Sequence, residues 1–292
     1  MMRAPRSLTV AIRKPKGEVT VKRQDLNPAS DRLPFLKLPI LRGVVALVEA
    51  LIYGISSLNY SANEALVTEG TEGKELSPWA LAGMMVFSLG LGIALFFILP
   101  LYVTQLVSHW FPLLRRSVLL FNLVDGFLRI LVFLLYVVLI SSFKDVRRVF
   151  EYHGAEHVAI HAYEEGRNLD LEKAKGLSPL HPRCGTSFLL WVMVISILVF
   201  SLLGRDLSLG AKVLSRVLLL PLVAGISYEL IKLSGKGKSL LVDWLVKPGL
   251  WLQKITTREP QDDQVEVAIR ALLEVLDMEK AKPDPLPGPR AA

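Results

Sequence analysis

Long apolar segments separated by short polar ones dominate the chain. A transmembrane helix needs about 20 predominantly apolar residues to cross about 30 Å of hydrocarbon. Four segments meet this requirement, the last of them interrupted by Pro221 and Glu229: residues 79–107, 118–140, 186–203 and 212–233. The pattern therefore predicts an all-α integral membrane protein with about four transmembrane helices.

A fifth apolar segment, residues 38–60, contains Arg42 and Glu49, which make it a poor free span. If this segment crossed the bilayer, the basic loop at 141–185 would move to the opposite side of the membrane. We therefore predict a re-entrant or interfacial helix here. A fifth span is the alternative.

Three further patterns describe segments outside the bilayer. Residues 8–23 alternate apolar and polar positions around a Lys-Pro-Lys-Gly turn and predict a small β-hairpin. Residues 260–280 repeat apolar residues at helical spacing and predict an amphipathic soluble helix. The resulting division is an N-terminal segment (1–37), the re-entrant or interfacial helix (38–60), a first transmembrane pair (79–140), a His-rich helix and loop (141–185), a second pair (186–233), an amphipathic region (234–280) and a Pro-rich disordered tail (281–292).

The distribution of charge gives the expected orientation. The chain has a formal net charge of +7 and a mean hydropathy of +0.43. Basic residues crowd the first 37 residues, the 144–183 loop and the region after 232. Cytoplasmic loops carry such an excess, so we expect both termini in the cytoplasm, the inner (plasma) membrane as location and the lipid bilayer, rather than nucleic acid, as partner. A homo-oligomer or a membrane-protein partner stays open.

Histidine is concentrated in one short stretch, "EYHGAEHVAIHAYEEG" (151–166), which holds three of the five histidines. At about 100° per helical residue, His153, His157 and His161 share one face with Glu156 and Glu164. His153-Gly-Ala-Glu156-His157 fits H-x-x-E-H, a pattern in which two histidines bind a metal ion and the glutamate activates water. A merely polar, solvated helix face is the alternative.

His181 and Cys184 extend the candidate ligand set. They form H-x-x-C just before the third span, where the loop returns to the membrane-proximal end of the His-bearing helix. Zinc commonly takes three protein ligands and a water in catalytic sites. We expect a divalent ion, most plausibly zinc, on His153 and His157 plus His181 or Cys184, with His161 as a further candidate ligand and Glu156 as catalytic base. With a single cysteine the chain has no internal disulfide, and an inert buried thiol is the alternative for Cys184.

Ionisable residues inside the apolar segments form a second signal, because charges in a bilayer are expensive and often functional. Asp125 and Arg129 lie four residues apart on one helix face, and Glu229 has Lys232 close by. We expect each pair to neutralise itself, as a structural lock or as part of a pathway. Asn122 is a candidate interhelical hydrogen-bond partner.

Several segments together resemble a bacterial family of uncharacterised multi-pass membrane proteins, the YqhQ type, described as predicted metal-dependent enzymes. They are "MMRAP", "VAIRKPKGE", "RVFEYHGAEH", "HPRCGTSF" and "PGLWLQKITTREP" followed by "QVEVAIRALL". The resemblance implies a membrane location and metal dependence through His153, Glu156, His157, His181 and Cys184. Relatives usually carry a Gly-rich segment before the "MMRGP" run and a glycine where this chain has Ala4, so we expect an incomplete N-terminal module.

Three hypotheses for function follow. The first is a membrane-embedded metal-dependent hydrolase with a cytoplasm-facing site. The second is a metal-ion or proton-coupled transporter or a metal sensor, with Asp125, Arg129 and Glu229 on the pathway. The third is a membrane scaffold with a structural metal.

Overall fold

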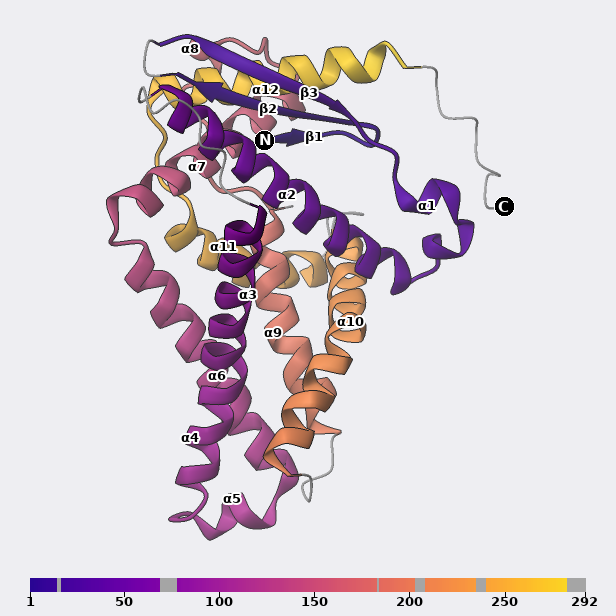
Figure 1. The fold of residues 1–292 in the computed structure, drawn as a ribbon, viewed down its shortest axis with the longest axis vertical. Helices are drawn as coiled ribbons and strands as arrows, with labels where there is room; N and C mark the ends of the chain where they lie inside the picture. The colour runs from indigo at the N-terminus through magenta and orange to yellow at the C-terminus, as the bar shows by residue number, and fades with distance from the viewer. Residues whose placement is uncertain (15–16, 69–77, 183, 203–207, 235–239, 283–292) are drawn as a thin grey trace.

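The computed structural model describes residues 1–292 apart from 15–16, 69–77, 183, 203–207, 235–239 and 283–292. The chain folds into a stem of long apolar helices and, at one end of the stem, a layer that contains a small sheet (Figure 1). The prediction of an all-α membrane protein with a small N-terminal β element is confirmed. Most of the predicted disordered tail lies outside the described residues.

The stem consists of two helical segments that precede the His-bearing helix and two that follow it. Its elements are α3 (Pro78–Ile93), the π-helical turn η2 (Ala94–Ile98), α4 (Leu99–Val107), α5 (Pro112–Arg116), α6 (Val118–Ile140), α9 (Gly185–Ser201) and α10 (Leu209–Ser234). Helix α9 packs against both α6 and α10. Because α3, η2 and α4 follow one another without a break, they form one long segment.

Four helices of the described chain are long and apolar enough to cross a membrane by length and composition: Leu41–Glu64, Ala82–Val107, Val118–Ile140 and Gly210–Leu233. The number equals the predicted number. The set includes the segment that we expected to be interfacial, and it leaves out α9, which is shorter. At about 1.5 Å per residue, a helix of α9's 17 residues lies at the short end of the range that spans hydrocarbon.

The predicted hairpin is present and is extended by one short strand. Strands β1 (Met2–Arg3), β2 (Ser7–Arg13) and β3 (Val19–Asp25) form an antiparallel sheet in the order β1-β2-β3. The register pairs Ser7 with Asp25 and Arg13 with Val19. Two short elements, α1 (Ala29–Arg32) and η1 (Pro34–Lys37), then connect the sheet to α2 (Leu41–Thr68).

We call the sheet, α7 (Lys144–Glu164), α8 (Leu171–Ala174) and α12 (Asp262–Lys280) the head. Helix α12 is the predicted amphipathic helix, and its apolar face packs on an alanine-rich face of α7. The sheet covers α12, and the hydroxyl of Thr9 donates a hydrogen bond of 2.7 Å to the Ala271 carbonyl. The sheet, α7 and α12 therefore form one packed unit at one end of the stem (Figure 1).

The transmembrane helix before the His cluster does not run into it, although the sequence between them has neither proline nor glycine. Helix α6 ends at Ile140 and α7 begins at Lys144. The hydroxyls of Ser141 and Ser142 both donate to the Val138 carbonyl, and Phe143 is extended. Serine hydroxyls that bond back to the chain compete with helix continuation, so α6 and α7 are two separate helices.

The charged residues of the stem form a larger cluster than the predicted pair. The Asp125–Arg129 pair is confirmed, with 3.1 Å between the carboxylate and the guanidinium. Arg216 of α10 adds a second guanidinium 2.9 Å from the same carboxylate oxygen and donates to the Asn122 amide oxygen. Asn122 is thus an interhelical partner, as expected. Glu229, by contrast, pairs with Arg42 of α2 rather than with Lys232.

Helix α2 has two different faces. Its polar face contacts the sheet through Glu49 and Glu64, which pair with Arg3 and Lys14. On the other face, apolar side chains are exposed, and they include Leu41, Val48, Leu51, Ile52, Ile55 and Leu58. In Figure 1 the axis of α2 runs obliquely to α6, α9 and α10. An exposed apolar face opposite a charged one is typical of a helix at a membrane surface.

Candidate metal centre

The His-bearing helix α7 buries one face in the head and turns the opposite face toward the stem. Ala155, Ala159 and Ala162 lie in the core formed with α12. At about 100° per residue, the histidines fall on the other side of the helix. Gly154 permits this packing, because a Cβ at that position would overlap the carbonyl oxygen of Arg258. The predicted common face of the three histidines therefore exists.

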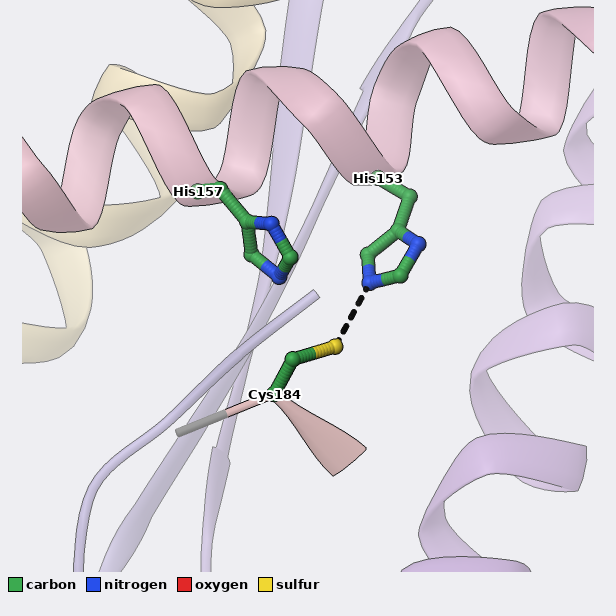
Figure 2. A group of neighbouring side chains, drawn as sticks. All are labelled: His153, His157 and Cys184. Atoms are coloured by element: carbon green, nitrogen blue, oxygen red, sulfur yellow. Dashed lines mark hydrogen bonds between the residues drawn. The ribbon is translucent and has the colours of Figure 1, made fainter. Parts of the chain in front are cut away.

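His153, His157 and Cys184 converge on one point. One ligand atom of each lies within 4.8 Å of the others, and Nε2 of His153 is 3.2 Å from the Cys184 sulfur. Figure 2 shows both rings projecting from α7 toward the cysteine at the start of α9. In a tetrahedral zinc site, nitrogen–sulfur and nitrogen–nitrogen ligand pairs are about 3.3–3.6 Å apart, given the bond lengths involved. The distance from His153 to Cys184 is close to this spacing, and the other two pairs lie within 4.8 Å.

Backbone carbonyls orient both rings. Nδ1 of His153 lies 2.9 Å from the Thr256 carbonyl, and Nδ1 of His157 lies 2.6 Å from the Pro179 carbonyl. A carbonyl oxygen only accepts, so each Nδ1 carries a proton, and Nε2 is the nitrogen of each ring that would give up its proton to bind a metal. Histidine ligands of metals are commonly held by such a second hydrogen bond. The arrangement therefore presents two Nε2 atoms to a cation.

The electrostatics favour a thiolate at Cys184. Burial raises the pKa of the thiol, but hydrogen bonds from His153 and His157 outweigh burial and lower the pKa to about 5. For His153 the effect of burial has the opposite sign and lowers the pKa. The hydrogen bond with Cys184 and the charge of Cys184 outweigh burial, so the pKa of His153 is raised. Because the thiolate is the form that binds metals, the sulfur of Cys184 is suited to be a ligand.

A second group adjoins the first. One ligand atom each from His161, Glu164 and His181 also lies within 4.8 Å of the others. Nε2 of His181 is 3.3 Å from a Glu164 oxygen, while Nε2 of His161 lies 2.9 Å from the Leu180 carbonyl. Burial lowers the pKa of His181 and so favours its neutral form. The structure thus divides the five predicted ligands between two adjacent groups and brings Cys184, rather than His181, to His153 and His157.

Glu156, the predicted base, belongs to neither group of the described chain. It is half-buried on α7, and its charge is among the smaller causes that raise the pKa of His153. Its carboxylate is therefore near the edge of the site. Glu164, which shares the predicted helix face, is the carboxylate that joins a ligand group.

Helix α11 (Leu240–Thr256) supplies residues that sequence reasoning missed. The Gln253 side chain is fully buried; its oxygen accepts from the His181 amide and its nitrogen donates to the His181 carbonyl. The Thr256 carbonyl orients His153. We assigned this segment only to an amphipathic region, since a single buried glutamine and a backbone carbonyl leave no periodic signal.

These features define a multi-pass membrane protein with a candidate metal site, made of histidines and the single cysteine, where the stem meets the head. Residues 38–278 match the family described as "Protein of unknown function (DUF1385)", and the chain belongs to this family. It is 35% identical over 254 residues to "Uncharacterized protein YqhQ" of Bacillus subtilis (strain 168), covering 83% of this chain and 78% of that protein. The predicted resemblance is confirmed. No solved structure matches the chain.

Proposed function

We propose that the protein is a membrane-embedded metal-dependent hydrolase whose divalent ion, zinc, is held by His153, His157 and Cys184. One observation carries the proposal: two imidazoles oriented through Nδ1 by backbone carbonyls direct Nε2 toward a buried sulfur. Three protein ligands leave one position open in a tetrahedral site, as is typical of catalytic zinc. When bound, the ion supplies Lewis acidity, which lowers the pKa of a nearby water molecule.

The protein's own residues supply the remaining parts of this mechanism. Glu156 is the base that we propose for removing a proton from water, because its charge is close enough to His153 to raise the pKa of that ring. The Thr256 and Pro179 carbonyls hold the rings in place. The two hydrogen bonds between the Gln253 side chain and the His181 backbone fix the position of the chain shortly before Cys184. Together these contacts hold the ligands before any ion arrives.

Transport is less well supported by the stem. A pathway needs polar groups that face a water-filled route. The carboxylate of Asp125 instead bonds to Arg129 and Arg216, and the guanidinium of Arg129 lies over the rings of Phe97 and Phe200. These ion pairs join α6 to α10 and favour a structural role, although one Asp125 oxygen and some guanidinium nitrogens of Arg129 and Arg216 are buried without a hydrogen-bond partner among the described residues.

The proposed base has a direct test. Glu156→Gln is expected to keep the metal content of the wild-type protein and to lose hydrolysis by about 100-fold or more, since general-base catalysis typically contributes that much. The measurement is elemental analysis beside a screen of chromogenic ester, phosphoester and peptide substrates. Activity should also disappear with a chelator and return with zinc. Glu165→Gln, an exposed position that pairs with Arg167, is the matched control. Loss of metal from Glu156→Gln would make Glu156 a ligand, and persistent hydrolysis in metal-free protein would exclude the mechanism.

We also propose that the head and both termini lie in the cytoplasm, at the inner membrane, and that α2 lies along the membrane surface. The packing of the sheet and of α7 on α12 supports this topology, because it requires all three on one side. The chain must then cross an even number of times between β3 and α7, and again between α7 and α12. Two crossings by α3–α4 and α6 satisfy the first condition only if α2 does not cross. Two crossings by α9 and α10 satisfy the second, and α11, with exposed Trp244 and Trp251, then lies at the interface, where tryptophan is enriched.

Single engineered cysteines test this topology. The native Cys184 is buried and should not react with the labelling reagent, so the signal comes from the engineered position. In intact cells, Arg116→Cys beside α5 is expected to react with a membrane-impermeant maleimide, whereas Arg148→Cys and Lys280→Cys in the head react only after permeabilisation. All three positions are exposed. Reaction of Arg148→Cys in intact cells would contradict the cytoplasmic placement of the site.

A further inference from the structure

A cavity of about 730 Å³ lies away from the metal centre, between the sheet, α1, α2 and the ends of α10 and α12. Its lining combines residues that are far apart in the sequence, among them Arg6, Arg42, Tyr228 and Lys282. Tyr228 and Lys232 belong to the last turns of the apolar helix Gly210–Leu233. On the topology proposed above, in which α2 lies along the membrane surface, the cavity lies at the depth of lipid headgroups.

The charges around the cavity do not balance. Six Lys and Arg side chains line it, together with three carboxylates. Two further carboxylates outside the lining, Glu229 and Asp25, pair with the lining residues Arg42 and Lys282. Counted over these described residues, the sum is one excess positive charge, which equals in size the charge of one phosphodiester. Lys232, on the exposed rim, is a basic residue that a ligand at this depth could reach.

We propose that this cavity binds the phosphodiester headgroup of an anionic phospholipid. Basic pockets between helices on the side of a membrane protein that faces anionic lipid are suited to such headgroups. Helix α2 supplies Val45 and Ala46 to the lining, and its exposed apolar face, with Leu41, Val48 and Ile52, offers a surface for the acyl chains. A soluble phosphate ester would use only the charged part. The apolar face beside the cavity is the reason for choosing a lipid.

The test uses the full-length protein in detergent and native mass spectrometry after addition of equimolar phosphatidylglycerol and phosphatidylcholine. Wild-type protein is expected to retain phosphatidylglycerol in preference to phosphatidylcholine. Lys232→Gln is expected to reduce that retention about fivefold, the typical contribution of one basic residue near an anionic membrane. Lys37→Gln, at another basic residue of the lining, should reduce it similarly. Arg148→Gln removes an exposed charge of α7 away from the cavity and should leave retention unchanged.

Competition separates lipid from soluble ligand. Glycerol phosphate and inorganic phosphate at millimolar concentration are expected not to displace the bound phosphatidylglycerol. Displacement that depends on Lys232 would mean that the cavity serves a soluble phosphate, and it would overturn the lipid proposal. Equal retention by wild type, Lys232→Gln and Lys37→Gln would overturn it as well. Both replaced side chains are exposed or partly paired at the surface, so the variants should fold, and unchanged thermal unfolding checks this.

Discussion

Protein carrying His157→Ala is expected to bind its divalent ion more than about 100-fold more weakly than the wild type. Removing a residue that only orients a metal ligand typically costs about 10–100-fold in metal affinity. His157 is itself one of the three converging candidate ligands, so its removal should cost more. The neighbouring carbonyl of Pro179 cannot replace it, because a zinc site of this kind takes nitrogen and sulfur ligands. The measurement is elemental analysis of purified protein, followed by competition with a chromophoric chelator.

The control for this experiment is His109→Ala. His109 lies after α4, where its ring bonds to the Gln105 carbonyl of the same turn, and its replacement should leave metal affinity unchanged. A wild-type protein that binds no divalent ion more tightly than His157→Ala would refute the metal centre and every mechanistic step built on it.

Two more variants tell which group holds the ion. Cys184→Ser removes the thiolate from the first group, and His161→Ala removes a member of the second. If the first group is the site, Cys184→Ser weakens binding strongly and His161→Ala does not. The reverse result would move the ion to His161, Glu164 and His181. If the wild type binds two ions and each variant binds one, both groups hold an ion. The two groups adjoin each other, with 5.7 Å between the ring centroids of His157 and His181.

Much of the fold was predictable because its causes are local. Apolar length predicts helices that cross a bilayer, and alternation around a turn predicts a hairpin. The four-residue spacing of His153, His157 and His161 fixes their common face once α7 is a helix. The return of the chain to Cys184 also follows from the order of the spans. Apart from the return to Cys184, these predictions depend on distances of a few residues along the chain, where periodicity carries the information.

The remainder depends on contacts between distant segments. Arg216 lies 94 residues from Asn122, and only the fold shows that its side chain reaches α6. Glu229 pairs with Arg42 and not with the predicted partner Lys232, because α2 packs against α10 next to Glu229. The division of the ligands into two groups depends on where the loop before α9 meets α7. Neither spacing nor composition determines such pairings.

The buried charge cluster of the stem gives the largest expected effect on stability. Two guanidiniums share the Asp125 carboxylate, at 3.1 Å from Arg129 and 2.9 Å from Arg216. All three side chains are almost fully buried. Asp125→Asn keeps the shape of the side chain but leaves two like charges without a counter-charge. Breaking a buried ion pair in this way typically costs about 3–5 kcal/mol, and we expect a loss of this size in the free energy of unfolding.

Arg216→Met should cost less than Asp125→Asn, because the Asp125–Arg129 pair survives and the apolar chain of methionine can fill the space. The double variant Asp125→Asn/Arg216→Met is expected to be less destabilised than the sum of the two single variants, since neighbours that share a partner are coupled. Unfolding by denaturant in detergent micelles, followed by circular dichroism, gives all three values. Glu165→Gln, which breaks the exposed pair with Arg167, is the control and should change stability by at most about 1 kcal/mol. A loss below about 1 kcal/mol for Asp125→Asn would show that water or another anion compensates the two guanidiniums, and that the carboxylate does not hold α6 and α10 together.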